Sequence, residues 1–408
     1  MQVHLETNPG LARTLRVQIP AARVEGAVAA RLKRIAAKAK MPGFRPGKAP
    51  FKVIESQYKD SARFEVMNEL INETFPKALD EVKLQPAGNP KFELGGMNEG
   101  MEYTASFDVY PEIVLNSAGL AVNKPEVSIT EADVDRLIDN LRKARKSFSE
   151  VSRAAATGDQ VTVDFIGKLD GEAYDVSVAF PEDYRAENLK GKTAVFSVTT
   201  KAVKEAVLPA LDDAEFLKAH GADSEATLRS KSRTALENER NKAVKNRVKG
   251  QVLDQLLASH PIDVPKGLIE QELPRLREEA IARMGQQFGN TKIPDDKKAE
   301  IFPDAMFEAA AKRRVALGLL IGEVIKAKSI KLDLNKVETT LAEMAGDYED
   351  PEEVKRYYRG RQDLMQGLRA VVLEEQVVEA LVAEANVSSD AMSLEALLNP
   401  PQQQPAAA

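Results

Sequence analysis

The sequence predicts a multidomain protein of the α+β class, in which a mixed N-terminal region and a small β module accompany a long helical region. Three observations support this prediction. The chain has 408 residues, which is more than one hydrophobic core normally organises. Its first part shows apolar residues both at alternating positions and at spacings of three and four. From about residue 204 onward, helical spacing dominates.

The first 112 residues combine strand and helix patterns. Alternating apolar residues over 13–19 predict a half-buried strand, and apolar spacings of four and three from residue 23 predict a helix that ends near Pro42. A second helix is predicted over 65–82, and a weaker alternation predicts a strand over 103–109. Residues 1–112 are therefore expected to form an α+β domain.

The next two segments are a linker with a helix and then a β module. Residues 113–150 are expected to form a linker and a first helix, which begins after Thr130 and has Asp133 placed to accept its free amides. Over 151–203 the apolar period changes to two, which predicts a small β module between helices.

The remainder of the chain has mainly helical character. Residues 204–398 carry amphipathic runs separated by proline-containing breaks, and this predicts an all-helical body. The segment 399–408 is rich in proline, glutamine and alanine, which is typical of a disordered tail.

Composition excludes several classes of function. The chain has no cysteine and three histidines that lie far apart, so thiolate chemistry is excluded and a histidine-rich metal site is not expected. Gly191-Lys192-Thr193 resembles the end of a phosphate-binding loop, but Ala186 occupies the position of the required first glycine. No cofactor is expected.

The location is also constrained by the sequence. The N-terminus lacks the basic and apolar regions of a signal peptide. The longest apolar run, 315–321, is much shorter than the ~20 residues of a membrane span. A cytoplasmic protein without membrane contact is expected.

The most unusual local feature is a basic segment over 26–54. It holds eight basic residues and no acidic one, although the whole chain has a net charge of −6. At its centre, glycines and prolines define a tight loop: Gly43-Phe44-Arg45-Pro46-Gly47-Lys48-Ala49-Pro50. Such a loop suits docking on an anionic surface, with Phe44 and Arg45 as anchors. An ordinary solvated basic helix followed by a turn is the alternative.

Methionine and aromatic residues are scattered among charges in the helical region. Such residues can line an adaptable binding surface for many apolar segments, and they can equally pack helix against helix. The candidates for a binding role are Met284, Phe288, Phe302, Met306, Phe307, Met344 and Tyr348.

The glycine–proline loop resembles the ribosome-docking motif of the bacterial trigger factor family. Further resemblances follow in a consistent order from residue 1 to about 398. They include Met1-Gln-Val, Pro86-Ala87-Gly88, Tyr110-Pro111-Glu112 and the segments 185–192, 262–265, 311–323, 348–351 and 373–376.

The resemblance implies an N-terminal ribosome-binding domain, an FKBP-type prolyl isomerase module and a discontinuous helical chaperone body. The implied activity is an ATP-independent chaperone that shields nascent chains and assists folding and export. Gly43, Phe44, Arg45, Gly47 and Lys48 would contact an exit-side ribosomal protein and nearby rRNA. Unfolded polypeptides are the other implied partners, and a weak homodimer off the ribosome is left open.

The isomerase module departs from the family pattern. The start and a stretch near the end of an FKBP module are similar, but the section between them, with its apolar floor, is missing. The remnants of the pocket wall would be Phe165, Tyr174, Asp175, Tyr184 and Phe196. Since such a pocket must exclude water, we expect little isomerase activity. An active isomerase with a rebuilt pocket and a plain RNA-binding protein are the alternatives.

Overall fold

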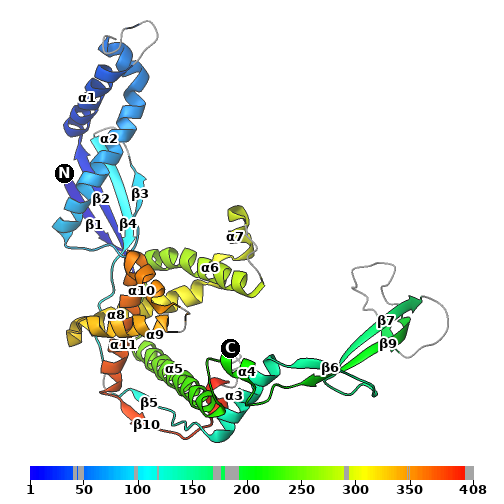
Figure 1. The fold of residues 1–408 in the computed structure, drawn as a ribbon. Coiled ribbons are helices and arrows are strands. Elements are labelled where there is room, and N and C mark those ends of the chain that lie inside the picture. The colour runs from blue at the N-terminus through cyan, green and yellow to red at the C-terminus, as the bar shows by residue number, and fades with distance from the viewer. Residues whose placement is uncertain are drawn as a thin grey trace. The chain divides into compact units, whose positions relative to one another are not determined.

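The computed structural model describes residues 1–39, 44, 50–95, 100–116, 119–168, 176–179, 193–288, 294–346, 348 and 350–399 (Figure 1). Residues 164–168, 176–179, 193–199, 286–288 and 295–296 are described by their backbone alone. The chain forms two compact units, and each consists of two segments. Unit 1 is Met1–Val122 with Lys249–Val387, and unit 2 is Asn123–Val248 with Ser388–Ala408. Helices and sheets occur in both, which confirms the α+β class.

Unit 1 begins with a four-stranded antiparallel sheet. Its strand order is β1-β2-β4-β3, with bounds Gln2–Thr7 for β1, Ala12–Pro20 for β2, Lys91–Leu94 for β3 and Gly100–Asp108 for β4. The predicted strands correspond to β2 and β4, whereas β1 and β3 were not predicted. Alternate residues of the two central strands are buried, namely Leu15, Val17, Ile19, Met101, Tyr103, Ala105 and Phe107.

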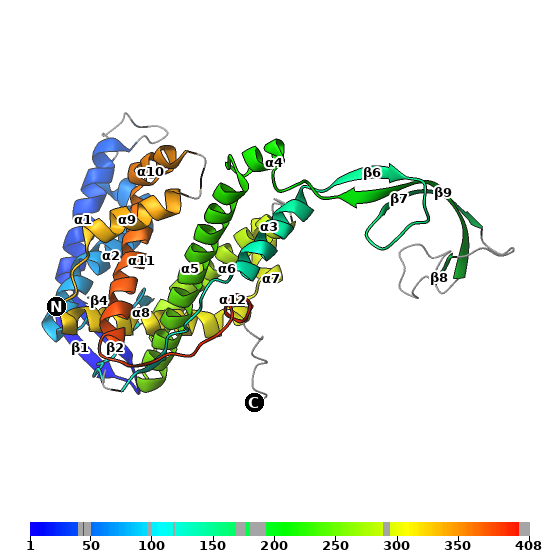
Figure 2. The same ribbon diagram turned by 60° about the horizontal axis from the view of Figure 1, so that its bottom comes forward.

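Two antiparallel helices complete this core, and they lie side by side in both views (Figures 1 and 2). Helix α1 spans Ala21–Lys38, as predicted, and α2 spans Phe51–Val82. The prediction that the second helix begins at residue 65 is wrong. Ile54 and Ala62 are fully buried in its first half, and polar residues between them obscure this apolar stripe in the sequence.

The rest of unit 1 is mainly helical. It contains the second part of α5 (Glu225–Ser259), α6 (Lys266–Phe288), α7 (Asp295–Ile301), the short 3-10 helix η1 (Asp304–Met306), α8 (Glu308–Lys328), α9 (Leu334–Ala345), α10 (Pro351–Gly360) and α11 (Gln362–Val382). Helix α8 packs against α6 and α11, and α9 packs against α10 and α11 (Figure 2). Within the predicted all-helical body, β10 (Asn386–Ser388) is a strand and pairs with β5 (Ala121–Asn123).

The start of α6 touches the N-terminal sheet through a glycine contact. A Cβ atom on Gly88, whose φ is +98°, would lie 2.6 Å from the carbonyl carbon of Gly267. Beside this contact, the Lys266 N–H donates to Asp108 Oδ2 at 2.6 Å, and Lys91 Nζ lies 3.2 Å from Glu270 Oε1. Substitution of either glycine would therefore separate the two backbones.

Unit 2 has a helical core and a β module. Helix α3 (Glu131–Ala144) begins at Thr130 as predicted, and packs with α4 (Ala214–Ala219), the first part of α5 and α12 (Leu394–Leu398). The module contains β6 (Ser147–Val151), β7 (Gln160–Lys168), β8 (Val176–Ala179) and β9 (Thr193–Val207). Strand β9 pairs with the other three, and all pairs are antiparallel.

Candidate functional site

The predicted docking loop connects α1 to α2. Of its five predicted contact residues, Phe44 is described, and 42% of its surface is exposed. Gly43, Arg45, Gly47 and Lys48 lie outside the described residues. Aromatic side chains are enriched at the centres of interfaces, so an exposed phenylalanine in this loop is suited to a contact with a partner.

The ends of both helices fix the points where the loop leaves and re-enters the fold. Helix α1 ends at Lys38, and the Ala39 N–H donates to the Ile35 carbonyl at 2.8 Å. Helix α2 begins after Pro50, whose carbonyl accepts the Val53 N–H at 2.9 Å. The first residue of α2 is a second phenylalanine, Phe51, with 42% of its surface exposed. Two exposed aromatic side chains therefore belong to this end of the helix pair.

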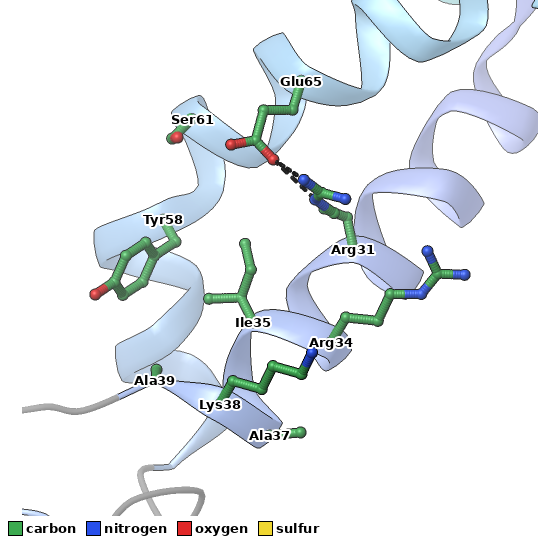
Figure 3. A pocket seen from close by; sticks show the side chains of 9 residues that line it. All are labelled: Arg31, Arg34, Ile35, Ala37, Lys38, Ala39, Tyr58, Ser61 and Glu65. Atoms are coloured by element: carbon green, nitrogen blue, oxygen red, sulfur yellow. Dashed lines mark hydrogen bonds and ion pairs between the residues drawn. The ribbon is translucent and has the colours of Figure 1, made fainter.

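A cavity of about 680 Å³ lies between the same ends of α1 and α2 (Figure 3). Ile35 from α1 and Tyr58 from α2 give it apolar surface, and charged side chains from both helices surround that surface. The full lining is Arg31, Arg34, Ile35, Ala37, Lys38, Ala39, Tyr58, Ser61 and Glu65.

The charges around this cavity do not cancel. Arg31 is neutralised, because its Nε donates to Glu65 Oε2 at 2.8 Å and its Nη1 donates to Glu69 Oε1 at 3.2 Å. Arg34 and Lys38 follow one helical turn apart, and among the described residues no acidic side chain lies within 4.0 Å of either. This end of the helix pair therefore presents excess positive charge, and Phe44 belongs to the loop that connects the two helices.

The predicted polypeptide-binding residues separate into two groups in unit 1. In the first, the Phe302 and Phe307 rings lie 6.4 Å apart between α7 and α8. Met306, which lies between them in sequence, has 64% of its surface exposed, and Met284 on α6 is half-buried. The Phe288 side chain lies outside the described part of the chain. Arg277 fixes the position of the aromatic pair, because its Nε donates to the Phe302 carbonyl at 3.0 Å.

The second group lies where α9 meets α10. Met344 and Tyr348 are exposed over 39% and 62% of their surfaces. Tyr357 on α10 is also exposed, and its ring lies 6.4 Å from that of Tyr358. Tyr358 packs on the small core formed by Val337, Leu341, Leu368 and Val372. The contacts of the described residues do not join this group to the first.

The five side chains predicted for the wall of a prolyl pocket all lie outside the described side chains, so this prediction stays a prediction. Phe196 lies in β9, opposite Gly167 of β7 and Val176 of β8, and Phe165 lies in β7 opposite Val198. The side chains of these two phenylalanines, and all of Tyr174, Asp175 and Tyr184, lie outside what is described.

Two carboxylates with lowered pKa values lie in ion pairs on the surface. Hydrogen bonds from Arg153 and from the Ala156 N–H hold the pKa of Asp159 below its ordinary value. Hydrogen bonds from Lys77 and Arg23 likewise lower the pKa of Glu73. No group of three or more metal-ligating side chains occurs among the described residues. These pairs stabilise local structure and do not form an acid–base site. In the described ranges, no helix is both long and apolar enough to cross a bilayer.

Sequence reasoning missed several exposed apolar residues. Phe51 and Phe64 on α2 and Leu334 at the start of α9 expose between 42% and 64% of their surfaces. Phe64 lies off the buried stripe that runs through Ala62 and Val66, so a complete helical pattern would have identified it. The helix predicted over 65–82 does not include Phe64.

Comparison with known proteins gives two family matches. The description "Bacterial trigger factor protein (TF)" matches residues 1–141, and "Bacterial trigger factor protein (TF) C-terminus" matches residues 226–383. Together these ranges include more than half of the chain, and residues 142–225 lie between them.

Full-length relatives agree with these matches. The chain is 40% identical to "Trigger factor" of Thioalkalivibrio sulfidiphilus over 439 residues, covering 98% of both proteins. It is also 40% identical to "Trigger factor" of Photobacterium profundum over 442 residues, covering 98% of this chain and 100% of the relative. Among solved structures, the chain is 20% identical to one described as "Promiscuous Substrate Recognition in Folding and Assembly Activities of the Trigger Factor Chaperone", with a TM-score of 0.46 over 94% of this chain and 100% of the other.

Proposed function

The chain belongs to the bacterial trigger factor family, whose members are ribosome-associated chaperones, and we propose that the loop between α1 and α2 is its docking element on the ribosome. The observation that carries this proposal is the exposed Phe44 in the loop between α1 and α2, two helices whose adjoining ends carry the unneutralised Arg34 and Lys38. An apolar anchor next to positive charge suits a surface that contains both protein and nucleic acid.

The charge and the aromatic anchor have separate roles in this proposal. Excess positive charge from Arg34, Lys38 and the neighbouring basic residues of 26–54 speeds the encounter with an anionic particle. Phe44 and Arg45 then give the contact its specificity, with an exit-side ribosomal protein and nearby rRNA as the partners. Gly43, Gly47 and Lys48 shape the loop and add charge to it.

Client polypeptides would bind to the dispersed exposed apolar groups of unit 1. The Phe302–Phe307 pair with Met306 forms one such group, and Met344 with Tyr348 forms another. Small separate patches give weak binding to many sequences, since neither patch demands one particular partner. Binding of this kind needs neither ATP nor a cofactor. A weak homodimer off the ribosome would cover the same groups.

Each predicted segment of the chain has its own role in this proposal. We assign ribosome binding to residues 1–112, a connection to 113–150, a shortened FKBP-like module to 151–203, client binding to 204–398 and a tail to 399–408. The two compact units support a discontinuous arrangement, because residues 249–387 join the N-terminal part of the chain and 123–248 form a unit with the C-terminal segment.

Co-sedimentation with vacant ribosomes tests the docking proposal. We expect the intact chain to pellet with ribosomes and the Phe44→Ala/Arg45→Ala variant to bind at least about tenfold more weakly, as for loss of an interface anchor. The matched control is Arg63→Ala/Phe64→Ala, which removes the same two residue types from α2, where Phe64 is 61% exposed. This control should bind like the intact chain.

Two results would contradict the proposal. Equal pelleting of both variants and the intact chain would mean that binding is diffuse attraction by the basic segment. If the intact chain does not pellet, it is not a ribosome factor, and suppression of aggregation in the absence of ribosomes then decides whether it is a chaperone at all.

A further inference from the structure

We propose that the free edge of β3 binds an extended segment of an unfolded polypeptide as an additional strand of the N-terminal sheet. This inference rests on the proposed chaperone function and specifies a binding site, a binding mode and a class of client sequence. Strand β3 is the last strand in the order β1-β2-β4-β3, so that within the described sheet one of its sides has no neighbouring strand.

The hydrogen bonding of β3 shows which backbone groups point outward. The Gly95 N–H donates to the Glu102 carbonyl at 2.8 Å. In an antiparallel ladder, residues that bond to the partner alternate with residues that do not. Glu93, opposite Thr104, therefore bonds to β4. Phe92 and Leu94 consequently direct their N–H and C=O groups away from β4, where an added strand can pair with them.

The side chains of the same two residues form an exposed apolar border. Phe92 and Leu94 lie opposite Ala105 and Tyr103, which are both fully buried, so they belong to the core face of the sheet. They nevertheless expose 42% and 47% of their surfaces. The Phe92 ring lies 5.0 Å from the Phe75 ring at 83°. The hydrophobic core thus continues to the edge of the sheet without being covered there.

The opposite edge of the sheet lacks this exposure. Strand β1 also has a free side, but its core-face residues Val3 and Leu5 are half-buried and pack against the core. An added strand at β1 would therefore cover less apolar surface than one at β3. Both edges offer backbone groups to an added strand, so the additional apolar burial at β3 makes it the favoured edge.

Charge on the other face of β3 identifies the occupant. Lys91 is paired with Glu270 at 3.2 Å, whereas no basic side chain among the described residues lies within 4.0 Å of Glu93. In a segment where apolar residues alternate with lysine or arginine, the apolar side chains can pack on Phe92 and Leu94 while a basic side chain on the other face pairs with Glu93. A second copy of β3 fits less well, because the antiparallel register that pairs both Phe92 and Leu94 places Glu93 opposite Glu93.

Amide exchange on the intact labelled chain tests the binding mode. The probe is an eight-residue peptide that alternates valine and lysine, and its counterpart alternates valine and glutamate. With the lysine peptide at about ten times its Kd, the Phe92 and Leu94 amides should exchange about tenfold more slowly. The Gly95 amide, already bonded to Glu102, serves as the internal control and should not change.

Substitutions separate the backbone contribution from the side-chain contribution. Leu94→Pro removes the outward N–H and keeps the bonds to β4, since proline is tolerated at such edge positions. It should bind the peptide about fivefold more weakly than Leu94→Ala, which loses the side chain alone. Glu93→Lys should weaken binding of the lysine peptide about threefold and strengthen binding of the glutamate peptide about threefold.

The outcomes distinguish this inference from the function on which it rests. Peptide binding without protection of Phe92 and Leu94, or equal affinity of Leu94→Pro and Leu94→Ala, overturns the β3 site. Protection of these amides that depends on protein concentration and needs no peptide assigns the edge to a second copy and also overturns it. If unfolded clients are held in an aggregation assay while β3 is unaffected, the chaperone function stands and only the β3 site fails. If neither clients nor peptides bind, the chaperone function itself fails.

Discussion

Tyr103 and Thr74 form a buried hydroxyl pair at the centre of the N-terminal core. Both are fully buried, their oxygens lie 3.0 Å apart, and the Thr74 hydroxyl lies 2.6 Å from the Leu70 carbonyl. Because a carbonyl can only accept, Thr74 donates to Leu70 and Tyr103 donates to Thr74. Burial raises the pKa of Tyr103.

This pair predicts a specific alkaline sensitivity. A pKa that is higher in the folded state gives stability that is complete below the unfolded value of about 10 and is lost as the pH rises through the folded value. Tyr103→Phe should cost about 1 kcal/mol of unfolding free energy at pH 7 and should flatten the loss of stability above about pH 10. Urea unfolding at pH 7, 10 and 11 measures both effects. Tyr348→Phe, at an exposed position, is the control, and the same pH profile in both variants would contradict the prediction.

The limits of sequence prediction are clear at single residues of the docking end. The loop composition identified Phe44 as an exposed anchor, and its surface is indeed exposed. The compensation of Arg31 by Glu65 and Glu69 was not predictable, because these residues come from separate helices and meet only when α1 and α2 pack. The sequence shows how many charged residues a segment contains. The positive charge that remains at Arg34 and Lys38 depends on which ion pairs form in the folded protein.

Helix α3 shows an element whose start is encoded locally. Thr130 and Asp133 form a reciprocal cap, in which the Thr130 N–H donates to Asp133 Oδ2 at 2.9 Å and the Asp133 N–H donates to Thr130 Oγ1 at 3.3 Å. The Thr130 hydroxyl also donates to Asp133 at 2.7 Å. These bonds, led by the one from the hydroxyl, lower the pKa of Asp133.

Removal of this cap should weaken the protein in a pH-dependent manner. Thr130→Ala should cost about 1 kcal/mol of unfolding free energy at pH 7. A lowered carboxyl pKa gives stability that is present above the unfolded value of about 3.9 and is lost as the pH falls through the folded value. The difference from the intact chain should therefore shrink at pH 3, as measured by urea unfolding. Thr339→Ala, which removes only a bond to the Asn335 carbonyl within α9, is the control. A constant difference between pH 7 and pH 3 would contradict the role of Asp133.

Elements whose pattern is complete in the sequence were predicted, and those that depend on partners were not. The periods over 13–19 and 23–41 gave β2 and α1 to within a few residues. Strand β3 has four residues, all of them exposed, so it lacks the buried alternation by which a strand is identified. It exists because β4 supplies its hydrogen bonds. Because the strand itself was not predictable from the sequence, its free edge was not predictable either.

The whole chain is organised by contacts between distant segments. Unit 1 joins residues 1–122 to residues 249–387, and the close approach of Gly88 to Gly267 is one of the contacts that join them. A pattern of apolar residues reveals each segment but not the pairing, because the same amphipathic helix can pack on many surfaces. The resemblance to a family implied a discontinuous helical body, and neither it nor composition and periodicity indicated that residues 249–387 join residues 1–122 in one compact unit.

The length of the chain relative to its family leads to a prediction about catalysis. The alignment with the Thioalkalivibrio relative spans 439 residues, whereas this chain has 408, so some residues of the relative have no counterpart here. In the β module, Lys168 of β7 is already opposite Val195 of β9. The connection between these paired positions includes β8 and leaves few residues to build the floor and wall of a prolyl pocket.

Prolyl isomerase activity should therefore be low, because a pocket open to water cannot favour the twisted amide over the planar one. We expect kcat/KM on a prolyl tetrapeptide to lie at least about a hundredfold below that of the Photobacterium relative, a loss comparable to removal of a preorganised stabilising group. The matched measurement is ribosome co-sedimentation of both proteins, which should be equal, because the proposed docking loop belongs to unit 1 and the β module to unit 2. A kcat/KM equal to that of the relative would mean that the connection between β7 and β9 rebuilds the pocket, and the alternative of an active isomerase would then hold.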